Sequence, residues 1–103
     1  MTSAAGNAID ERVLAEASRV LRVLAHPHRL RIVELLMDER HAVGELAGAM
    51  GLAPAAVSQH LSQMRAHGIL DVERDGRTAY YRVTNPNAIN VIRCIRKHGC
   101  GRA

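Results

Sequence analysis

Three prolines divide this chain, and each one stands where a segment of helical periodicity begins. Proline suits the first turn of a helix, because the N–H that it lacks would have no partner there. It also disfavours helical backbone in the residue before it. Apolar residues recur at three- and four-residue steps after each proline, and also before the first one. The pattern predicts helices from Ile9 to about Ala25, from Pro27 to about Met37, from Pro54 to Gly68 and from Pro86 to His98.

Two further segments complete the predicted order of elements. A short helix is expected from Val43 to Met50, where Gly51 can then take the left-handed conformation that ends many helices. The residues after Gly68 alternate loosely, which predicts strands at 69–74 and 78–84 joined by a type I′ turn at Asp75-Gly76. The predicted fold is mainly α with a β-hairpin, in the order α-α-α-α-β-β-α.

The length and composition of the chain fit one small domain. It has 103 residues, of which 48% are hydrophobic, with no Phe or Trp and two Tyr. Aliphatic side chains must therefore fill the core, which favours closely packed helices over a β-sandwich. A domain of this size buries a modest fraction of its surface, so dimerisation would stabilise it. We expect a disordered tail at 1–8, the folded domain at 9–98 and a second tail at 99–103.

The charge of the chain suits a polyanionic partner such as nucleic acid. The formal net charge is +4 and the isoelectric point is about 9.8. We expect a cytoplasmic protein, because there is no membrane-spanning run and no visible signal peptide. In that compartment, Cys94 and Cys100 are expected as free thiols, metal ligands or a redox pair. No phosphate loop and no catalytic constellation is visible, which argues against an enzyme.

The helix at 43–50, the turn Gly51-Leu52-Ala53 and the helix from Pro54 form a helix-turn-helix pattern. In DNA-binding proteins, the N-terminal half of the second helix enters the major groove. Ser and Gln can hydrogen-bond to base edges, Ala can touch a thymine methyl group, and Arg or His can meet a phosphate. The side chains predicted to face DNA are Ala55, Ser58, Gln59, His60, Ser62 and Arg65.

Arginines flank the tip of the predicted hairpin. Arg74 and Arg77 lie on either side of Asp75-Gly76, and Arg82 lies on the return strand. Outward polar residues on a helix, or a charged hairpin tip, are by themselves ordinary solvent-facing features. The ordered combination of a helix-turn-helix and a basic hairpin instead favours a winged helix-turn-helix, whose wing contacts phosphates or the minor groove.

The segments LAHPHRLRIVELL, VGELAGAMGLAPAAVSQHLSQMRAHGIL and VERDGRTAYYRV resemble the arsenic-repressor (ArsR/SmtB) family of winged-helix regulators, over roughly residues 9–98. The resemblance implies a homodimer formed through the first and last helices, which binds a palindromic operator and represses transcription. It also implies release of the DNA when a metal ion, metalloid or thiol oxidant reaches a sensing site. By position, the family's DNA contacts correspond to Pro54, Ala55, Ser58 and Gln59 in the major groove and to Arg74 and Arg77 in the wing.

The two best-known sensing sites of that family have no full counterpart here. The first needs cysteines where this chain has Ala42-Val43-Gly44, and the second keeps only His98 of its ligands. Cys94, His98 and Cys100 could instead bind a soft ion such as As(III), Zn(II) or Cd(II). The two thiols could also be oxidised, persulfidated, or joined in a disulfide within or between subunits. Arsenite-binding members of the family have a further cysteine at the position of Arg93.

Two other interpretations stay open at this stage. Cys94 could be an apolar interface residue and Cys100 an incidental thiol, which would leave a DNA-binding regulator without an inducer site. The chain could also be a protein-interaction module with a degenerate winged helix.

The remaining histidines give weaker signals. His26 is expected to be structural, and His28, His41 and His67 are expected to be exposed. The spacing of His26 and His28 across a proline matches no recognised metal site.

Overall fold

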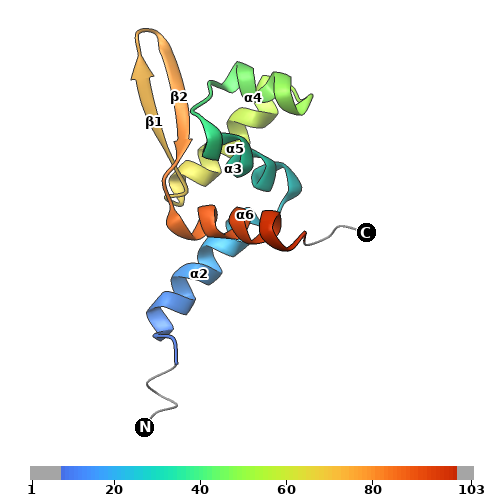
Figure 1. Cartoon of the computed structure of the whole chain (residues 1–103). Coiled ribbons are helices and arrows are strands. Elements are labelled where there is room, and N and C mark those ends of the chain that lie inside the picture. The colour runs from blue at the N-terminus through green and yellow to red at the C-terminus, as the bar shows by residue number, and fades with distance from the viewer. Residues whose placement is uncertain (1–7, 100–103) are drawn as a thin grey trace.

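The computed structural model describes residues 8–99, which form five helices and one β-hairpin (Figure 1). In chain order these are α2 (Glu11–Leu24), α3 (Pro27–Asp38), α4 (Val43–Met50), α5 (Pro54–Ala66), β1 (Leu70–Asp75), β2 (Thr78–Val83) and α6 (Pro86–His98). The order confirms the mainly helical fold with a hairpin that the sequence predicts. Most of the two predicted tails, 1–8 and 99–103, lies outside the described residues. Among those residues, no helix is both long and apolar enough to cross a membrane.

Three helices begin at the prolines, as predicted. Before α3, the Nδ1 atom of His26 accepts a hydrogen bond of 3.1 Å from the backbone N–H of His28. Before α6, the Oδ1 atom of Asn85 accepts a bond of 2.9 Å from the N–H of Asn87. Such caps satisfy backbone donors that have no partner within the helix. The cap position of α5 is Ala53, which has no side-chain acceptor, so Pro54 and the preceding turn set where that helix begins.

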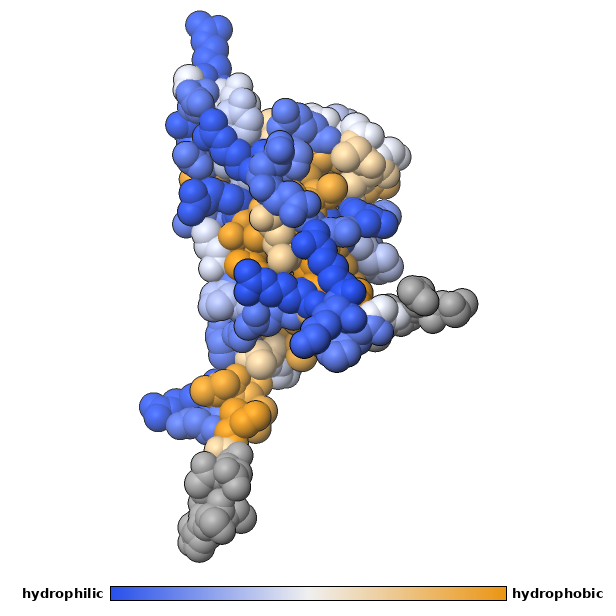
Figure 2. Space-filling model, viewed as in Figure 1, coloured by the Kyte–Doolittle hydropathy of each residue, from blue (hydrophilic) through white to orange (hydrophobic). Residues whose placement is uncertain are grey.

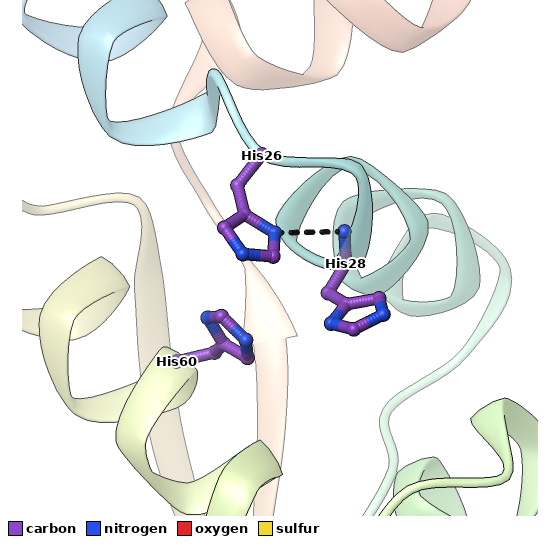
Figure 3. A group of neighbouring side chains, drawn as sticks. All are labelled: His26, His28 and His60. Atoms are coloured by element: carbon purple, nitrogen blue, oxygen red, sulfur yellow. Dashed lines mark hydrogen bonds between the residues drawn. The ribbon is translucent and has the colours of Figure 1, made fainter.

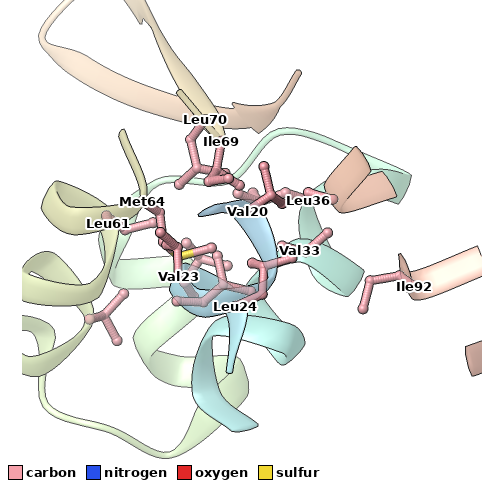
Figure 4. Close-up of a cluster of buried hydrophobic side chains, with 14 of the residues drawn as sticks. Val20, Val23, Leu24, Val33, Leu36, Leu61, Met64, Ile69, Leu70 and Ile92 are labelled. Carbon is pink, nitrogen blue, oxygen red and sulfur yellow. The ribbon is translucent and has the colours of Figure 1, made fainter. Parts of the chain in front are cut away.

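The core is filled by aliphatic side chains and one methionine, to which all five helices and β1 contribute (Figure 4). Burying one such Leu, Ile or Met side chain stabilises the fold by roughly 1.5–3 kcal/mol. The buried residues are Val20, Val23, Leu24, Ile32, Val33, Leu36, Leu46, Ala47, Val57, Leu61, Met64, Ile69, Leu70, Ala88 and Ile92. Since α5 supplies three of them from one side, its other side is left for solvent or a partner.

The hairpin turn differs from the prediction by one position. Asp75 pairs with Thr78, so the turn consists of Gly76 and Arg77. Gly76 has a φ of 66°, and no residue other than glycine has a positive φ in the described part of the chain. A type I′ turn at Asp75-Gly76 is therefore wrong. A single positive φ at the first central position is the pattern of a type II′ turn, which places Arg77 in the tip itself.

Candidate nucleic-acid interface

The junction between α4 and α5 is the three-residue turn that the sequence predicts. α4 ends at Gly51, whose φ of 67° and ψ of 33° lie in the left-handed region. The N–H of Leu52 donates a bond of 3.1 Å to the carbonyl of Ala47 and closes the helix end. A Cβ at Gly51 would meet no atom within 4 Å, so its positive φ is the reason that a glycine suits this position.

The two sides of α5 differ sharply in exposure. Val57, Leu61 and Met64 face the core and are at most 1% exposed. Every residue of α5 predicted to face DNA is exposed except His60, which is half-buried. The exposed ones are Pro54, Ala55, Ser58, Gln59, Ser62 and Arg65. They form a polar surface of small and amide side chains that ends in a cation, which suits contacts to base edges and phosphates.

The hairpin extends beside this helix pair (Figure 1). Its arginines are exposed. Arg74 and Arg77 are exposed, and neither forms an ion pair with another residue between 8 and 99. Arg82 differs, because its Nη1 atom lies 3.7 Å from a carboxylate oxygen of Glu73. The two tip arginines are therefore available to a phosphate, whereas Arg82 is partly neutralised within the hairpin.

Arg40, which follows α3, holds the hairpin to the helical body. Its Nη1 atom lies 3.2 Å from Glu73, its Nη2 atom donates to Asp75 at 3.0 Å, and its Cζ atom lies 4.2 Å from the centre of the Tyr80 ring. The hydrogen bond to Asp75, helped by the nearby carboxylates, raises the pKa of Arg40 above its ordinary value. No pattern in the sequence around Arg40 indicates this role, because its partners lie more than 30 positions away.

His41 reinforces this attachment through its backbone. Its N–H donates to the carbonyl of Tyr81 at 3.1 Å, and the N–H of Tyr81 donates back at 2.8 Å. The side chain of His41 is half-buried, so the predicted exposure is wrong: pairing with β2 draws this residue against the hairpin. The N–H of Ala42 then donates to a carboxylate oxygen of Glu45 at 2.9 Å, which satisfies a donor at the start of α4.

Three histidines lie together where α3 begins beside α5 (Figure 3). His60 comes from α5, while His26 and His28 come from the start of α3. Arg29 donates from Nε to the Nδ1 atom of His60 at 3.1 Å, and from Nη1 to the carbonyl of Val23 at 3.1 Å. Burial, and then the positive charges of the neighbouring histidines and Arg29, lower the pKa of His60. His60 is thus held in its neutral form as a hydrogen-bond acceptor.

The predicted sensing residues lie on or after α6. Cys94 is exposed and is a free thiol, and His98 is exposed one helical turn later. Cys100, the third residue of this group, lies outside the described residues.

An exposed polar helix after a tight turn, beside an arginine-tipped hairpin, defines this molecule as a winged helix-turn-helix. A family model described as "Bacterial regulatory protein, arsR family" matches residues 26–72, which run from the residue before α3 into β1. The HTH-type transcriptional regulator YgaV of Escherichia coli K12 is 37% identical over 78 residues, which cover 75% of this chain and 78% of that protein. This chain spans between 59% and 83% of the length of the curated relatives that it matches.

Solved structures agree with this assignment. The crystal structure of the transcriptional repressor BigR from Xylella fastidiosa has a TM-score of 0.81 at 28% identity, covering 99% of this chain and 100% of that one. The solution structure of Mb0332 from Mycobacterium bovis, described as a homodimeric winged helix-turn-helix DNA-binding domain, has a TM-score of 0.74 at 25% identity. It covers 90% of this chain and 88% of that chain. The chain belongs to the arsR family of bacterial regulatory proteins, and it is a DNA-binding regulator rather than an enzyme.

Proposed function

We propose that this chain is a transcriptional repressor that binds a palindromic operator as a homodimer, on DNA in the cytoplasm. The observation that carries the proposal is the exposed polar face of α5 beside the unpaired arginines of the hairpin tip. Gln59 and Ser58 on the N-terminal half of α5 are assigned to base edges, with Pro54 and Ala55 allowing close approach. The phosphate contacts are assigned to His60, Ser62, Arg65, Arg74 and Arg77.

Dimerisation is supported by apolar surface that one chain leaves uncovered. On α2 and just before it, the side chains of Ile9, Val13, Leu14 and Leu21 are 50% to 59% exposed. Figure 2 shows orange, hydrophobic surface on this projecting end. A groove lined by Leu30, Ile92 and Ile95 also runs between α3 and α6. We assign the dimer interface to α2 and α6, because a partner chain would bury both surfaces.

Operator binding can be tested without knowing the operator. Duplexes selected from a random pool give a site, and fluorescence anisotropy then measures its affinity over a series of salt concentrations. We expect a twofold-symmetric site, and an affinity that falls steeply with salt because phosphate contacts release counterions. Gln59→Ala should weaken the selected site by about 1–3 kcal/mol and relax the base preference beneath it. Gln63→Ala, which changes the same side chain one turn later in the same groove, measures how far along α5 the base contacts extend. Selection that enriches no sequence would favour a protein-interaction module instead.

A second proposal concerns the signal that ends repression. Cys94 is an exposed thiol one turn from His98, and Cys100 follows in the sequence. We assign to these three residues either a soft-ion site for As(III), Zn(II) or Cd(II), or a pair of thiols that responds to an oxidant or persulfide. Either event would change the end of α6, which is one of the two helices assigned to the dimer interface.

The thiol proposal is tested with the reduced protein bound to its selected operator. Arsenite, Zn(II), Cd(II), peroxide and polysulfide are added separately, and the same series is repeated with Cys94→Ser and Cys100→Ser. We expect at least one reagent to release DNA from the native chain and neither variant to respond to it. If both variants respond like the native chain, or no reagent releases DNA, the chain is a regulator without an inducer at these cysteines.

A further inference from the structure

The three histidines at the junction of α3 and α5 lie closer together than separate surface residues would. Ring centres are 5.1 Å apart for His26 and His28, 4.6 Å for His26 and His60, and 5.6 Å for His28 and His60. One ring nitrogen from each can be chosen so that all three lie within 4.8 Å of one another. Figure 3 shows the ring of His26 turned toward His60 on the facing helix, with the ring of His28, from the same segment as His26, beside them.

We infer that His26, His28 and His60 form a binding site for one divalent transition-metal ion, with Zn(II) as the expected occupant. Three imidazoles with an open fourth position are an established ligand set for this ion, and Co(II), Ni(II) and Cu(II) accept the same donors. Tetrahedral geometry with a Zn–N distance of 2.0–2.1 Å places ligand nitrogens about 3.3 Å apart. The three nitrogens must therefore close by up to about 1.5 Å, which side-chain rotation of partly exposed rings can provide.

Metal binding must compete with two hydrogen bonds that already use these rings. The Nδ1 atom of His26 accepts from the N–H of His28, and the Nδ1 atom of His60 accepts from Arg29. A metal on Nδ1 takes the same lone pair, and a metal on Nε2 moves the ring proton to Nδ1. Either way both hydrogen bonds end. Binding at this site is thus coupled to release of the Arg29 side chain from His60.

His60 and Arg29 affect metal binding at this junction in opposite senses. Neutral imidazole is the form that binds metal, and the Nδ1 atom of His60 already presents a lone pair as an acceptor of the Arg29 hydrogen bond. Arg29 acts in the opposite sense, because its charge repels a cation and its Nε atom occupies His60. We expect Arg29→Gln to bind metal severalfold more tightly than the native chain. That result would not follow if the histidines only packed against one another.

The site joins the beginning of α3 to the helix assigned to the major groove, and the next step rests on the proposed function. His60 lines a surface groove together with Ser58, Gln59 and Ser62. A bound ion adds two positive charges beside this face, fixes α5 against α3 and frees Arg29 for a phosphate. Each of these changes favours a polyanionic partner. Metal at the histidine site should therefore strengthen operator binding, in contrast to the release proposed for the cysteines.

Cobalt spectroscopy tests the site on the full-length chain. Co(II) is titrated into Cys94→Ser/Cys100→Ser protein, so that thiolate coordination cannot contribute. We expect one Co(II) per chain, visible bands of a tetrahedral nitrogen–oxygen site, and displacement by Zn(II). His28→Gln should abolish the bands while leaving the fold intact, because the His28 side chain is exposed and only its backbone N–H takes part in the cap that His26 provides to α3.

Matched variants separate ligand loss from structural damage. His26→Asn should also abolish the bands while keeping an acceptor at the cap of α3. His67→Gln makes the same exchange as His28→Gln at an exposed histidine outside the cluster, and it should bind Co(II) like its parent. Bands that are absent from the parent, or unchanged by His28→Gln, would overturn the metal site.

The coupling is measured as operator affinity with and without Zn(II) in the same cysteine-free background. We expect Zn(II) to tighten binding severalfold in the parent and to have no effect in His28→Gln. A normal cobalt spectrum with an unchanged operator affinity would overturn the coupling and leave the site standing. Failure to bind any operator in either metal state would instead contradict the proposed function, since the spectrum is recorded without DNA.

Discussion

The molecule presents two surfaces whose chemistry is opposite, and they lie toward opposite ends of the fold (Figure 1). The surface of α5 and the hairpin is polar and basic, with exposed Gln59 and Arg77. α2 instead exposes large apolar side chains among its charged ones, with Leu14 half exposed although it can reach no core in its own chain. Water solvates a polar surface, whereas exposing an apolar surface to water is unfavourable, so a partner that buries it stabilises the protein. The polar surface can therefore act in a single chain, whereas the apolar surface requires a second one.

The largest effect should come from breaking the apolar surface. Leu14→Glu places a charge where a partner chain would bury leucine, so we expect a monomer in analytical ultracentrifugation. Operator affinity should then fall by about a thousandfold, because the avidity of two linked half-sites is lost. The fold of each chain should persist, since Leu14 is outside the core. Arg22→Glu, an exposed position of the same helix, serves as the control, and a Leu14→Glu protein that stays dimeric would move the interface elsewhere.

The next effect distinguishes the two sides of α5. Leu61→Ala removes a side chain that is 1% exposed, so we expect the free energy of unfolding to fall by about 3 kcal/mol through lost burial and a residual cavity. Ser62→Ala, the adjacent exposed residue, should leave urea denaturation unchanged to within about 0.5 kcal/mol. Equal destabilisation by both changes would mean that Ser62 is not on a solvent-facing side.

The tip of the hairpin should give a smaller, purely electrostatic effect. Arg77→Ala should weaken operator binding about tenfold and lower the slope of log affinity against log salt by about one, as expected for one lost phosphate contact. The measurement is anisotropy at several salt concentrations. Arg82→Ala, which removes an arginine already paired with Glu73, should change the slope less. Equal salt slopes for Arg77→Ala and Arg82→Ala would mean that the ion pair with Glu73 does not keep Arg82 from contacting a phosphate.

Local signals in the sequence sufficed for most of the fold. Prolines and apolar periodicity identified five helices, and the exposed face of α5 follows from the spacing of Val57, Leu61 and Met64. The turn was misplaced because Asp-Gly suits type I′, whereas the strand register selects Gly76 and Arg77. For His60 the sequence predicts a phosphate contact alone, since its contact with His28 depends on packing across 32 positions. Contacts between distant segments have no periodic signature, so only the folded structure reveals them.

Arg40 gives the smallest predicted effect and the sharpest test of how the hairpin relates to the helical body. It is a positioning residue: it contacts Glu73, Asp75 and Tyr80 but lies before the DNA-facing helix in sequence and is outside the predicted contacts. Its ion pairs are exposed, so the stability of the whole domain should barely change in Arg40→Ala. The hairpin should instead sample more orientations, which is visible as faster amide exchange in β1 and β2.

Operator affinity of Arg40→Ala should therefore fall by about threefold, since one positively charged element is held less firmly in place. The salt slope separates positioning from contact: it should stay at the native value, unlike that of Arg77→Ala, if Arg40 acts only through the hairpin. Arg40→Lys keeps the charge but cannot bridge both carboxylates with a planar fork, so it should restore the affinity only in part. A slope lowered by about one in Arg40→Ala would instead mean that Arg40 meets a phosphate, and the basic surface would extend to the end of α3.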